Sequence, residues 1–174
     1  MTRYAILIRG INVGKAKRIA MADLRAALTG AGYANVATLL QSGNVVLDAD
    51  QPAAKVAREV EQVVEKRFGY TVDVIVRSHD ELAGVVERNP FRGEATDGSR
   101  YVVAFLAKAP RTPPLKDLDF GAERHVLDGT ELYIWCPDGL RDSPLMAALA
   151  KEKGGPTATV RNWNTVEKLL AMMD

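Results

Sequence analysis

The chain of 174 residues has very few of the side chains that build disulfide-bonded or metal-bound scaffolds. It contains one cysteine, Cys136, and two histidines, His79 and His125. A single cysteine cannot form an internal disulfide, which is typical of a reducing compartment, so we expect a cytoplasmic location. With so few histidine and cysteine side chains, no zinc site is predicted. Nothing in the sequence indicates another metal or a cofactor.

Long apolar runs and an excess of one charge are missing as well. No stretch approaches the roughly 20 apolar residues that cross a bilayer. A strand is predicted almost from Met1, so no signal peptide is expected, and no membrane partner either. The net charge is +1, which predicts no polyanion as a partner of the whole molecule. Several cations nevertheless precede the first acid, Asp23: Arg3, Arg9, Lys15, Lys17 and Arg18.

The apolar residues that are present predict regular elements along the whole chain. A hydrophobic content of 47% with 26% charged residues is ordinary for a soluble globular protein. The clearest periodicity predicts a helix over 52–68, with apolar residues at helical spacing from Val56 to Phe68. Gly43 and the pair Asp128-Gly129 indicate the turns of two hairpins. The first half therefore reads β-α-β-β-α-β.

The second half repeats this order, with a degenerate first helix of perhaps one turn at 115–118 and an additional closing helix. We predict an α+β fold of two ferredoxin-like β-α-β-β-α-β halves packed together. The halves are 1–77 and 98–174, joined by a connecting helix and loop over 78–97. Ser78 and Glu81 have the spacing of a capping box that starts this helix. The repeat is one of element order, without clear similarity in sequence.

The first candidate site follows the first predicted strand. Gly10 and Gly14 permit close approach of the backbone to an anion, Asn12 tolerates unusual dihedral angles, and Arg9 and Lys15 supply positive charge. The segment matches neither the P-loop nor the dinucleotide-binding pattern. The alternative is a solvated loop whose glycines only serve turns.

The second candidate site is Gln41-Ser42-Gly43-Asn44, between two apolar strands. Ser42 and Asn44 could form hydrogen bonds with a ligand. The preferred interpretation is a hairpin turn whose small polar residues bond to their own backbone. Ser42 has no evident base, so the spacing does not predict a catalytic triad.

The third candidate site joins the last strand to the last helix. Arg161 and a Trp163 ring could hold an anion that carries a planar group, beside helix N–H groups. Asn162 or Asn164 could cap the helix, and Asn164 has capping-box spacing with Glu167. The alternative is structural: the asparagines cap, the tryptophan fills a seam and the arginine pairs with an acid.

These strings together resemble a bacterial family known as domain of unknown function 1697. The motifs are Arg9 to Gly14, Met21 with Leu24-Arg25, Gln41 to Val46, Asn89-Pro90-Phe91 and Thr159 to Val166, so the resemblance spans about 3–171. It implies a small, stand-alone protein with two ferredoxin-like halves and no established activity, ligand or catalytic residue. The family often has a second glycine where this chain has Lys15, which implies a less open loop. Thr159 keeps a threonine that commonly lies two residues before the arginine.

The leading functional hypothesis is a binding module for an anionic small molecule, nucleotide-like or otherwise phosphorylated. Its cleft would bring the segment 9–18 together with 161–165. Alternatives are a single-stranded nucleic-acid-binding protein, an enzyme of unidentified reaction class and a protein-interaction scaffold. A low aromatic content of 6% counts against the nucleic-acid hypothesis. Oligomeric state is left open, since unpaired sheet edges could support a dimer.

Overall fold

The computed structural model describes residues 1–174. Contacts between residues divide the chain into two units, and the boundary runs through two helices, α3 (His79–Glu87) and α5 (Trp163–Met173). The first unit comprises Met1–Gly84 with Lys168–Asp174, and the second comprises Val85–Glu167. The last turns of α5 therefore belong with the N-terminal part of the chain.

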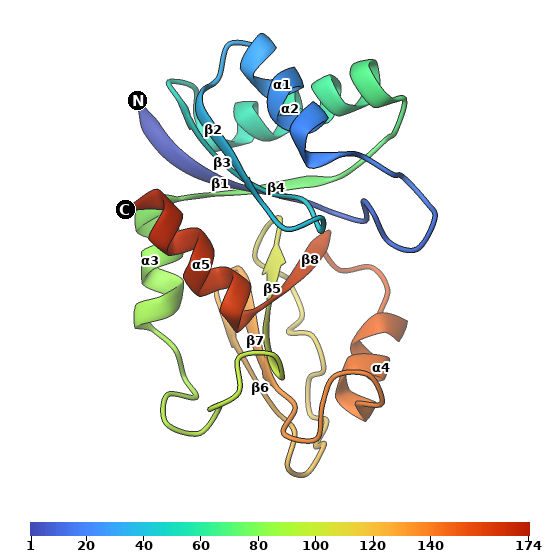
Figure 1. Cartoon of the computed structure of the whole chain (residues 1–174). Coiled ribbons are helices and arrows are strands. Elements are labelled where there is room, and N and C mark those ends of the chain that lie inside the picture. Colours follow the sequence, from blue (N-terminus) through green and yellow to red (C-terminus); the bar gives the residue numbers. More distant parts are fainter. The chain divides into compact units, whose positions relative to one another are not determined.

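The first unit is a four-stranded antiparallel sheet with the strand order β2-β3-β1-β4. Two helices, α1 and α2, lie side by side on one face of this sheet (Figure 1). This strand order is that of the ferredoxin-like split βαβ unit, as predicted. The elements are β1 (Thr2–Ile8), α1 (Met21–Gly30), β2 (Ala34–Leu39), β3 (Asn44–Ala49), α2 (Ala53–Phe68) and β4 (Val74–Ser78).

The second unit has the equivalent order β6-β7-β5-β8, again antiparallel. Between β5 and β6 the chain forms no helix, only a turn in which the Leu118 N–H donates to the Leu115 carbonyl over 3.2 Å. The predicted single helical turn at 115–118 is thus a hydrogen-bonded turn. The elements are β5 (Tyr101–Leu106), β6 (Arg124–Asp128), β7 (Glu131–Trp135), α4 (Pro144–Lys151) and β8 (Ala158–Asn162).

Side-chain alternation builds one core on the helix-covered face of each sheet. In the first unit, Ile6 and Leu47 of the sheet pack in one cluster with Val60 of α2. In the second unit, Ala104 of the sheet packs in one cluster with Leu145 of α4. In β1 and β5, the residues that point to the opposite face of the sheet are buried too. Burial on both faces explains why these two strands read as uninterrupted apolar runs.

The predicted helix boundaries rest on caps that the structure contains. Glu81 and Ser78 exchange hydrogen bonds, with the Ser78 N–H donating over 3.0 Å and the Glu81 N–H over 3.2 Å. Ser143 caps α4 by accepting from the Met146 N–H at 3.0 Å. Gly69 ends α2 in the left-handed region with φ of 77°. The capping box and the end of the helix predicted over 52–68 are confirmed.

Candidate functional site

Residues 9–19 form a small projecting hairpin after β1, which we call the basic finger (Figure 1, blue loop). The Asn12 N–H donates to the Lys17 carbonyl over 3.1 Å, and the Ala16 N–H donates to the Val13 carbonyl over 3.2 Å. Gly14, with φ of 59°, occupies the tight turn at the tip. The segment predicted as a glycine-rich cradle is therefore a protruding hairpin.

Asn12 closes the base of the basic finger and joins it to the loop between β2 and β3. Its Oδ1 accepts from the Ile19 N–H at 2.8 Å, and its Nδ2 donates to the carbonyls of Ile19 at 2.8 Å and Gln41 at 2.7 Å. Its φ of 55° lies in the left-handed region, which asparagine tolerates better than most residues. Both Nδ2 hydrogens are used inside the chain, so Asn12 positions the finger and offers no N–H donor to a ligand.

The cations of the basic finger are exposed and loosely held. The Arg9 guanidinium lies 3.7 Å from the Asp73 carboxylate, and both side chains are more than half exposed. Such a pair contributes about 0–1 kcal/mol, which leaves Arg9 available to a ligand. Lys17 donates to a backbone carbonyl, that of Thr71, over 2.8 Å. Lys15 is exposed at the tip and makes no hydrogen bond or ion pair with the chain.

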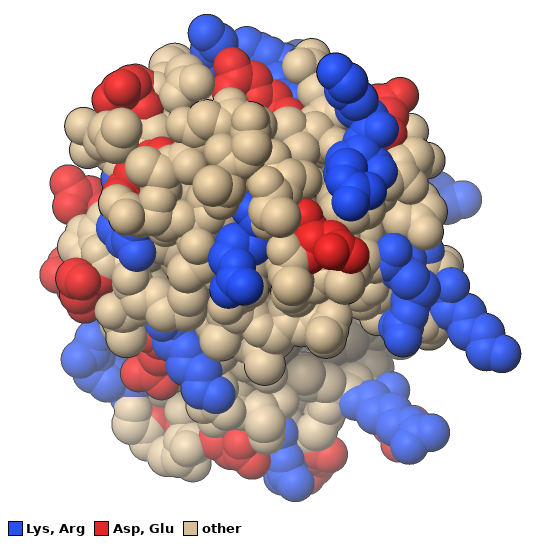
Figure 2. Space-filling view, turned by 45° about the horizontal axis from the view of Figure 1, so that its top comes forward, with Lys and Arg blue, Asp and Glu red and all other residues tan.

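Other cations also lie on this part of the surface. The Arg18 guanidinium donates to the Gly14 carbonyl over 3.0 Å, within the finger itself. Figure 2 shows Lys and Arg side chains projecting at many places on this face of the molecule, with Asp and Glu side chains between them. The basic finger thus concentrates positive charge that the net charge of the chain conceals.

The loop between β2 and β3 serves its hairpin, in line with the preferred interpretation of the second candidate site. The Asn44 side chain is fully buried, and its Nδ2 donates to the Leu39 carbonyl and to the Ser42 hydroxyl, each at 2.9 Å. A ligand at the surface cannot reach Asn44. The hydrogen bond between Asn12 and Gln41 nevertheless brings this loop beside the basic finger.

Arg161, predicted to bind an anion at the surface, is buried in β8. It is 8% exposed, and its guanidinium donates to the Thr159 hydroxyl at 2.8 Å and to the Val160 carbonyl at 2.9 Å. Burial lowers the pKa of Arg161 to about 10, because the interior disfavours its charge. The next residue, Asn162, caps α5 by accepting from the Thr165 N–H at 2.9 Å. These two residues therefore act in the fold.

Trp163 and Asn164 form the first turn of α5. The Trp163 indole is 8% exposed and stacks on the Tyr101 ring, with centroids 4.7 Å apart and planes at 24°. Its faces are covered, so it offers no stacking surface to a ligand. Asn164 is exposed, and its side chain packs against Gly98. A Cβ added at Gly98 would meet the Asn164 side chain and would lie 3.3 Å from the Asn164 backbone nitrogen. The predicted third site is thus a structural junction.

The same strand-end motif occurs once in each unit. Val76-Arg77-Ser78 closes β4 and Val160-Arg161-Asn162 closes β8. In each, the arginine is buried, its guanidinium donates to the carbonyl of the preceding valine, and the following residue accepts a hydrogen bond from the third residue beyond it. This equivalence supports a structural role for Arg161. The two clusters of predicted site residues lie in different units, and the joint cleft stays a prediction.

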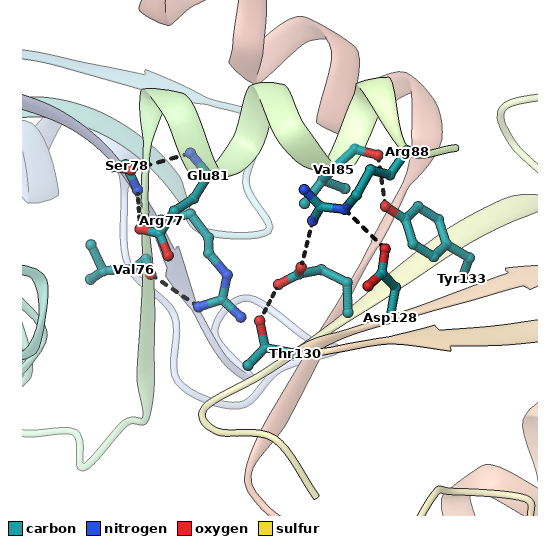
Figure 3. Close-up of polar contacts among 10 residues, drawn as sticks. Val76, Arg77, Ser78, Glu81, Val85, Arg88, Asp128, Thr130 and Tyr133 are labelled. Atoms are coloured by element: carbon teal, nitrogen blue, oxygen red, sulfur yellow. Dashed lines mark hydrogen bonds and ion pairs between the residues drawn. The ribbon is translucent and has the colours of Figure 1, made fainter. Parts of the chain in front are cut away.

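Sequence analysis did not identify a polar network in the second unit, centred on the buried Glu131 (Figure 3). The Thr130 hydroxyl donates to Glu131 over 2.6 Å, and Arg88 lies 3.6 Å from its carboxylate. Arg88 also donates to Asp128 over 2.9 Å, which raises the pKa of the guanidinium. The signal was an acid at the start of an otherwise apolar strand. With Arg88 bridging both carboxylates, the network orders the chain and presents no paired acid and base.

The contacts of His79 with two carboxylates, all in the first unit, make the stability of the fold depend on pH. The His79 ring contacts the carboxylates of Asp174 and Asp80, and these hydrogen bonds, that of Asp174 foremost, raise the pKa of His79. Their contribution to stability is fully present below the unfolded histidine pKa of about 6.5 and is lost as pH rises through the higher folded value.

We therefore expect a steeper fall in melting temperature for the natural chain than for His79→Gln between about pH 6 and pH 9. Thermal melts of both proteins across this range, at constant ionic strength, measure the difference. Parallel profiles would show that these contacts contribute nothing to stability.

Metal and thiol chemistry find little support in the structure. No group of three or more His, Cys, Asp or Glu side chains is arranged to hold a metal ion. Cys136 is buried beside Ser143, and burial raises the pKa of its thiol to about 11, which disfavours the thiolate. No helix combines the length and the apolar character needed to cross a bilayer.

These observations define an α+β protein of two ferredoxin-like units with a basic finger on the first. The chain belongs to the family described as "Protein of unknown function (DUF1697)", whose pattern matches residues 1–133. The match includes the finger and the 41–44 loop, while the closing motif from Thr159 lies beyond it. No curated protein matches the sequence.

A solved structure confirms the fold. The chain is similar to the conserved bacterial protein SP0830 from Streptococcus pneumoniae, with a TM-score of 0.81 and 22% sequence identity. The similarity covers 99% of this chain and 99% of that one.

Proposed function

We propose that the protein binds a phosphorylated or otherwise anionic small molecule, such as a nucleotide, at the basic finger of the first unit. One observation carries this proposal: the hydrogen bond from Asn12 to Gln41 ties the finger to the loop between β2 and β3, and two hydrogen bonds between Asn12 and Ile19 close the base of the finger, so its exposed cations are presented at a fixed place. An exposed cation on an anchored loop loses less conformational freedom on binding than one on a flexible tail. The cations are Arg9, Lys15, Lys17 and Arg18.

The start of α1 supports the same proposal. The helix begins at Met21, two residues after the finger ends, and its N-cap residue, Ala20, makes no side-chain capping bond. The N–H groups of a first helical turn have no partner within the helix, and the helix dipole favours an anion near them. Backbone donors and exposed cations thus lie next to each other along the chain.

The alternative of a sheet that stacks single-stranded bases loses support. Tyr101 and Tyr133, in the strands of the second sheet, are fully buried, and Trp135 is 8% exposed. Bases stack on aromatic rings that are open to solvent, and these rings are covered. Binding through the finger does not require them.

The proposal is tested by removing charge from the finger. For the triple variant Lys15→Ala, Lys17→Ala, Arg18→Ala we expect at least about a tenfold loss of affinity, since one charge-assisted hydrogen bond contributes about 1.5–3 kcal/mol. Isothermal titration at low salt with inorganic phosphate and then ATP measures it.

The matched control removes three exposed cations from the loop between β5 and β6, in the variant Lys108→Ala, Arg111→Ala, Lys116→Ala. This control should bind as the natural chain does, and both triple variants should melt close to it. Equal affinity of the two triple variants, or no binding of either anion to the natural chain, would overturn the proposal.

A further inference from the structure

Two aliphatic side chains are exposed where the basic finger meets the loop between β2 and β3. Val13 is 68% exposed and Leu40 is 54% exposed. They are far apart in sequence, but their chain neighbours Asn12 and Gln41 are joined by a 2.7 Å hydrogen bond. The fold therefore brings the two segments that carry them side by side, and we call Val13 and Leu40 together the apolar tip.

Neither packing nor backbone preference explains the leucine in this tip. Leu40 has φ of 61°, in the left-handed region that bulky side chains rarely adopt. Glycine or asparagine would fit this conformation with less strain. A strained and exposed leucine is better explained by a contact outside the chain.

The two stretches of chain that carry the apolar tip contain cations but no acid, and Asp73, which lies 3.7 Å from Arg9, comes from another segment. The stretch 9–22 contains four cations and no Asp or Glu, and the stretch 37–47 contains no acid. A surface that combines aliphatic groups with cations complements one in which negative charge overlies an apolar layer. Anionic phospholipid headgroups above acyl chains have this arrangement.

We propose that the basic finger docks on an anionic phospholipid surface, with Val13 and Leu40 entering the interface and the finger cations facing headgroup phosphates. This inference rests on the proposed function, because the same cations bind the phosphate in both cases. It adds the source of the phosphate and a role for the apolar tip. It departs from the expectation, drawn from the sequence, of no membrane partner, because the two aliphatic residues lie in separate segments.

Other anionic partners fit the tip less well. Single-stranded nucleic acid is held by stacking on aromatic side chains, whereas this tip is aliphatic. A folded protein partner needs a larger apolar and polar contact area than two side chains and one loop supply. A lipid surface needs only shallow insertion together with charge attraction, which gives weak, reversible and salt-sensitive binding.

The test uses the full chain with sedimentation of vesicles. Vesicles of phosphatidylglycerol with phosphatidylcholine should bind the protein at low salt, and vesicles of phosphatidylcholine alone should not. The double variant Val13→Ser, Leu40→Ser should reduce binding at least about tenfold, because each aliphatic side chain loses its burial in the interface. Its affinity for free inorganic phosphate and ATP should be unchanged.

A matched control removes exposed aliphatic side chains away from the apolar tip. Leu118→Ser, Val160→Ser removes one exposed leucine and one exposed valine from the second unit and should leave vesicle binding unchanged. Binding of free phosphate without binding of anionic vesicles would overturn the lipid inference and leave the proposed function standing. Vesicle binding that is unchanged in the Val13→Ser, Leu40→Ser variant would overturn it too. Titration with single-stranded RNA tests the other partner class: RNA binding that the same double variant loses would also overturn the lipid inference. Failure to bind either phosphate or vesicles would overturn both proposals.

Discussion

Replacing Trp163 by alanine should lower the free energy of unfolding by about 3–5 kcal/mol, the usual cost of truncating a buried aromatic side chain. The indole is 8% exposed and stacks on the fully buried Tyr101. Its loss removes apolar burial, the ring contact and part of the packing of Tyr133, whose ring centroid lies 6.4 Å away. Urea denaturation of the full chain, followed by circular dichroism, measures the change.

A milder substitution at the same position separates packing from ligand binding. Trp163→Phe keeps an aromatic ring against Tyr101 and should recover more than half of the lost stability. A tryptophan that served mainly as a surface for a ligand would behave differently. Its alanine variant would change stability by less than about 0.5 kcal/mol, as is usual for surface substitutions. That result would restore Trp163 as a candidate binding residue.

Gly43→Ala should cost about 2–4 kcal/mol through backbone strain combined with overpacking. Gly43 has φ of 92°, and an added Cβ would lie 2.8 Å from Ile11 Cδ1 and 3.1 Å from the Ile8 carbonyl oxygen. Neither neighbour can move freely, because Ile11 is buried and the Ile8 N–H donates to the Gly43 carbonyl over 2.9 Å. Chemical denaturation measures the loss, and displacement of Ile11 should also weaken phosphate binding by the finger.

Gly129→Ala supplies the matched control in the other hairpin. Gly129 also has positive φ, 63°, but no atom lies within 4 Å of the position of its Cβ. Only the conformational cost remains, about 1–2 kcal/mol. Equal losses in the two variants would show that Gly43 is required for its dihedral angle alone and that the contact with Ile11 is unimportant.

The fold was predictable because its signals are local. The stripe from Val56 to Phe68, the glycines of the two hairpins and the Ser78–Glu81 spacing each specify an element from nearby residues. The structure confirms all of them, and the strand order follows from the element order. The missing helix between β5 and β6 was expected as a degenerate element of one turn at most.

The candidate sites were less predictable, because polar side chains in a sequence do not reveal which partners they will meet. The hydrogen bond from Asn12 to Gln41 spans 29 positions, so no local pattern could show that the asparagine is already engaged. Arg161 looked like a surface cation because charged residues are seldom fully buried. The sequence did contain one indication, because Val76-Arg77-Ser78 and Val160-Arg161-Asn162 both place an arginine after a valine near the end of a predicted strand. An arginine that recurs at equivalent strand ends favours a role in the fold.

The recurrence of one scaffold within the chain also bears on how its surface can change. In both units the residue after the first strand, Arg9 or Ala107, donates its N–H to the residue at the start of the fourth-strand region, Asp73 or Thr157, over 2.9 and 2.8 Å. The first unit continues from there into the finger and α1, whereas the second continues into a helix-free loop. The molecule thus holds two versions of one frame with different insertions. The basic finger is not required by the sheet that the two units share. Its charged and apolar side chains can therefore change while the sheet stays the same.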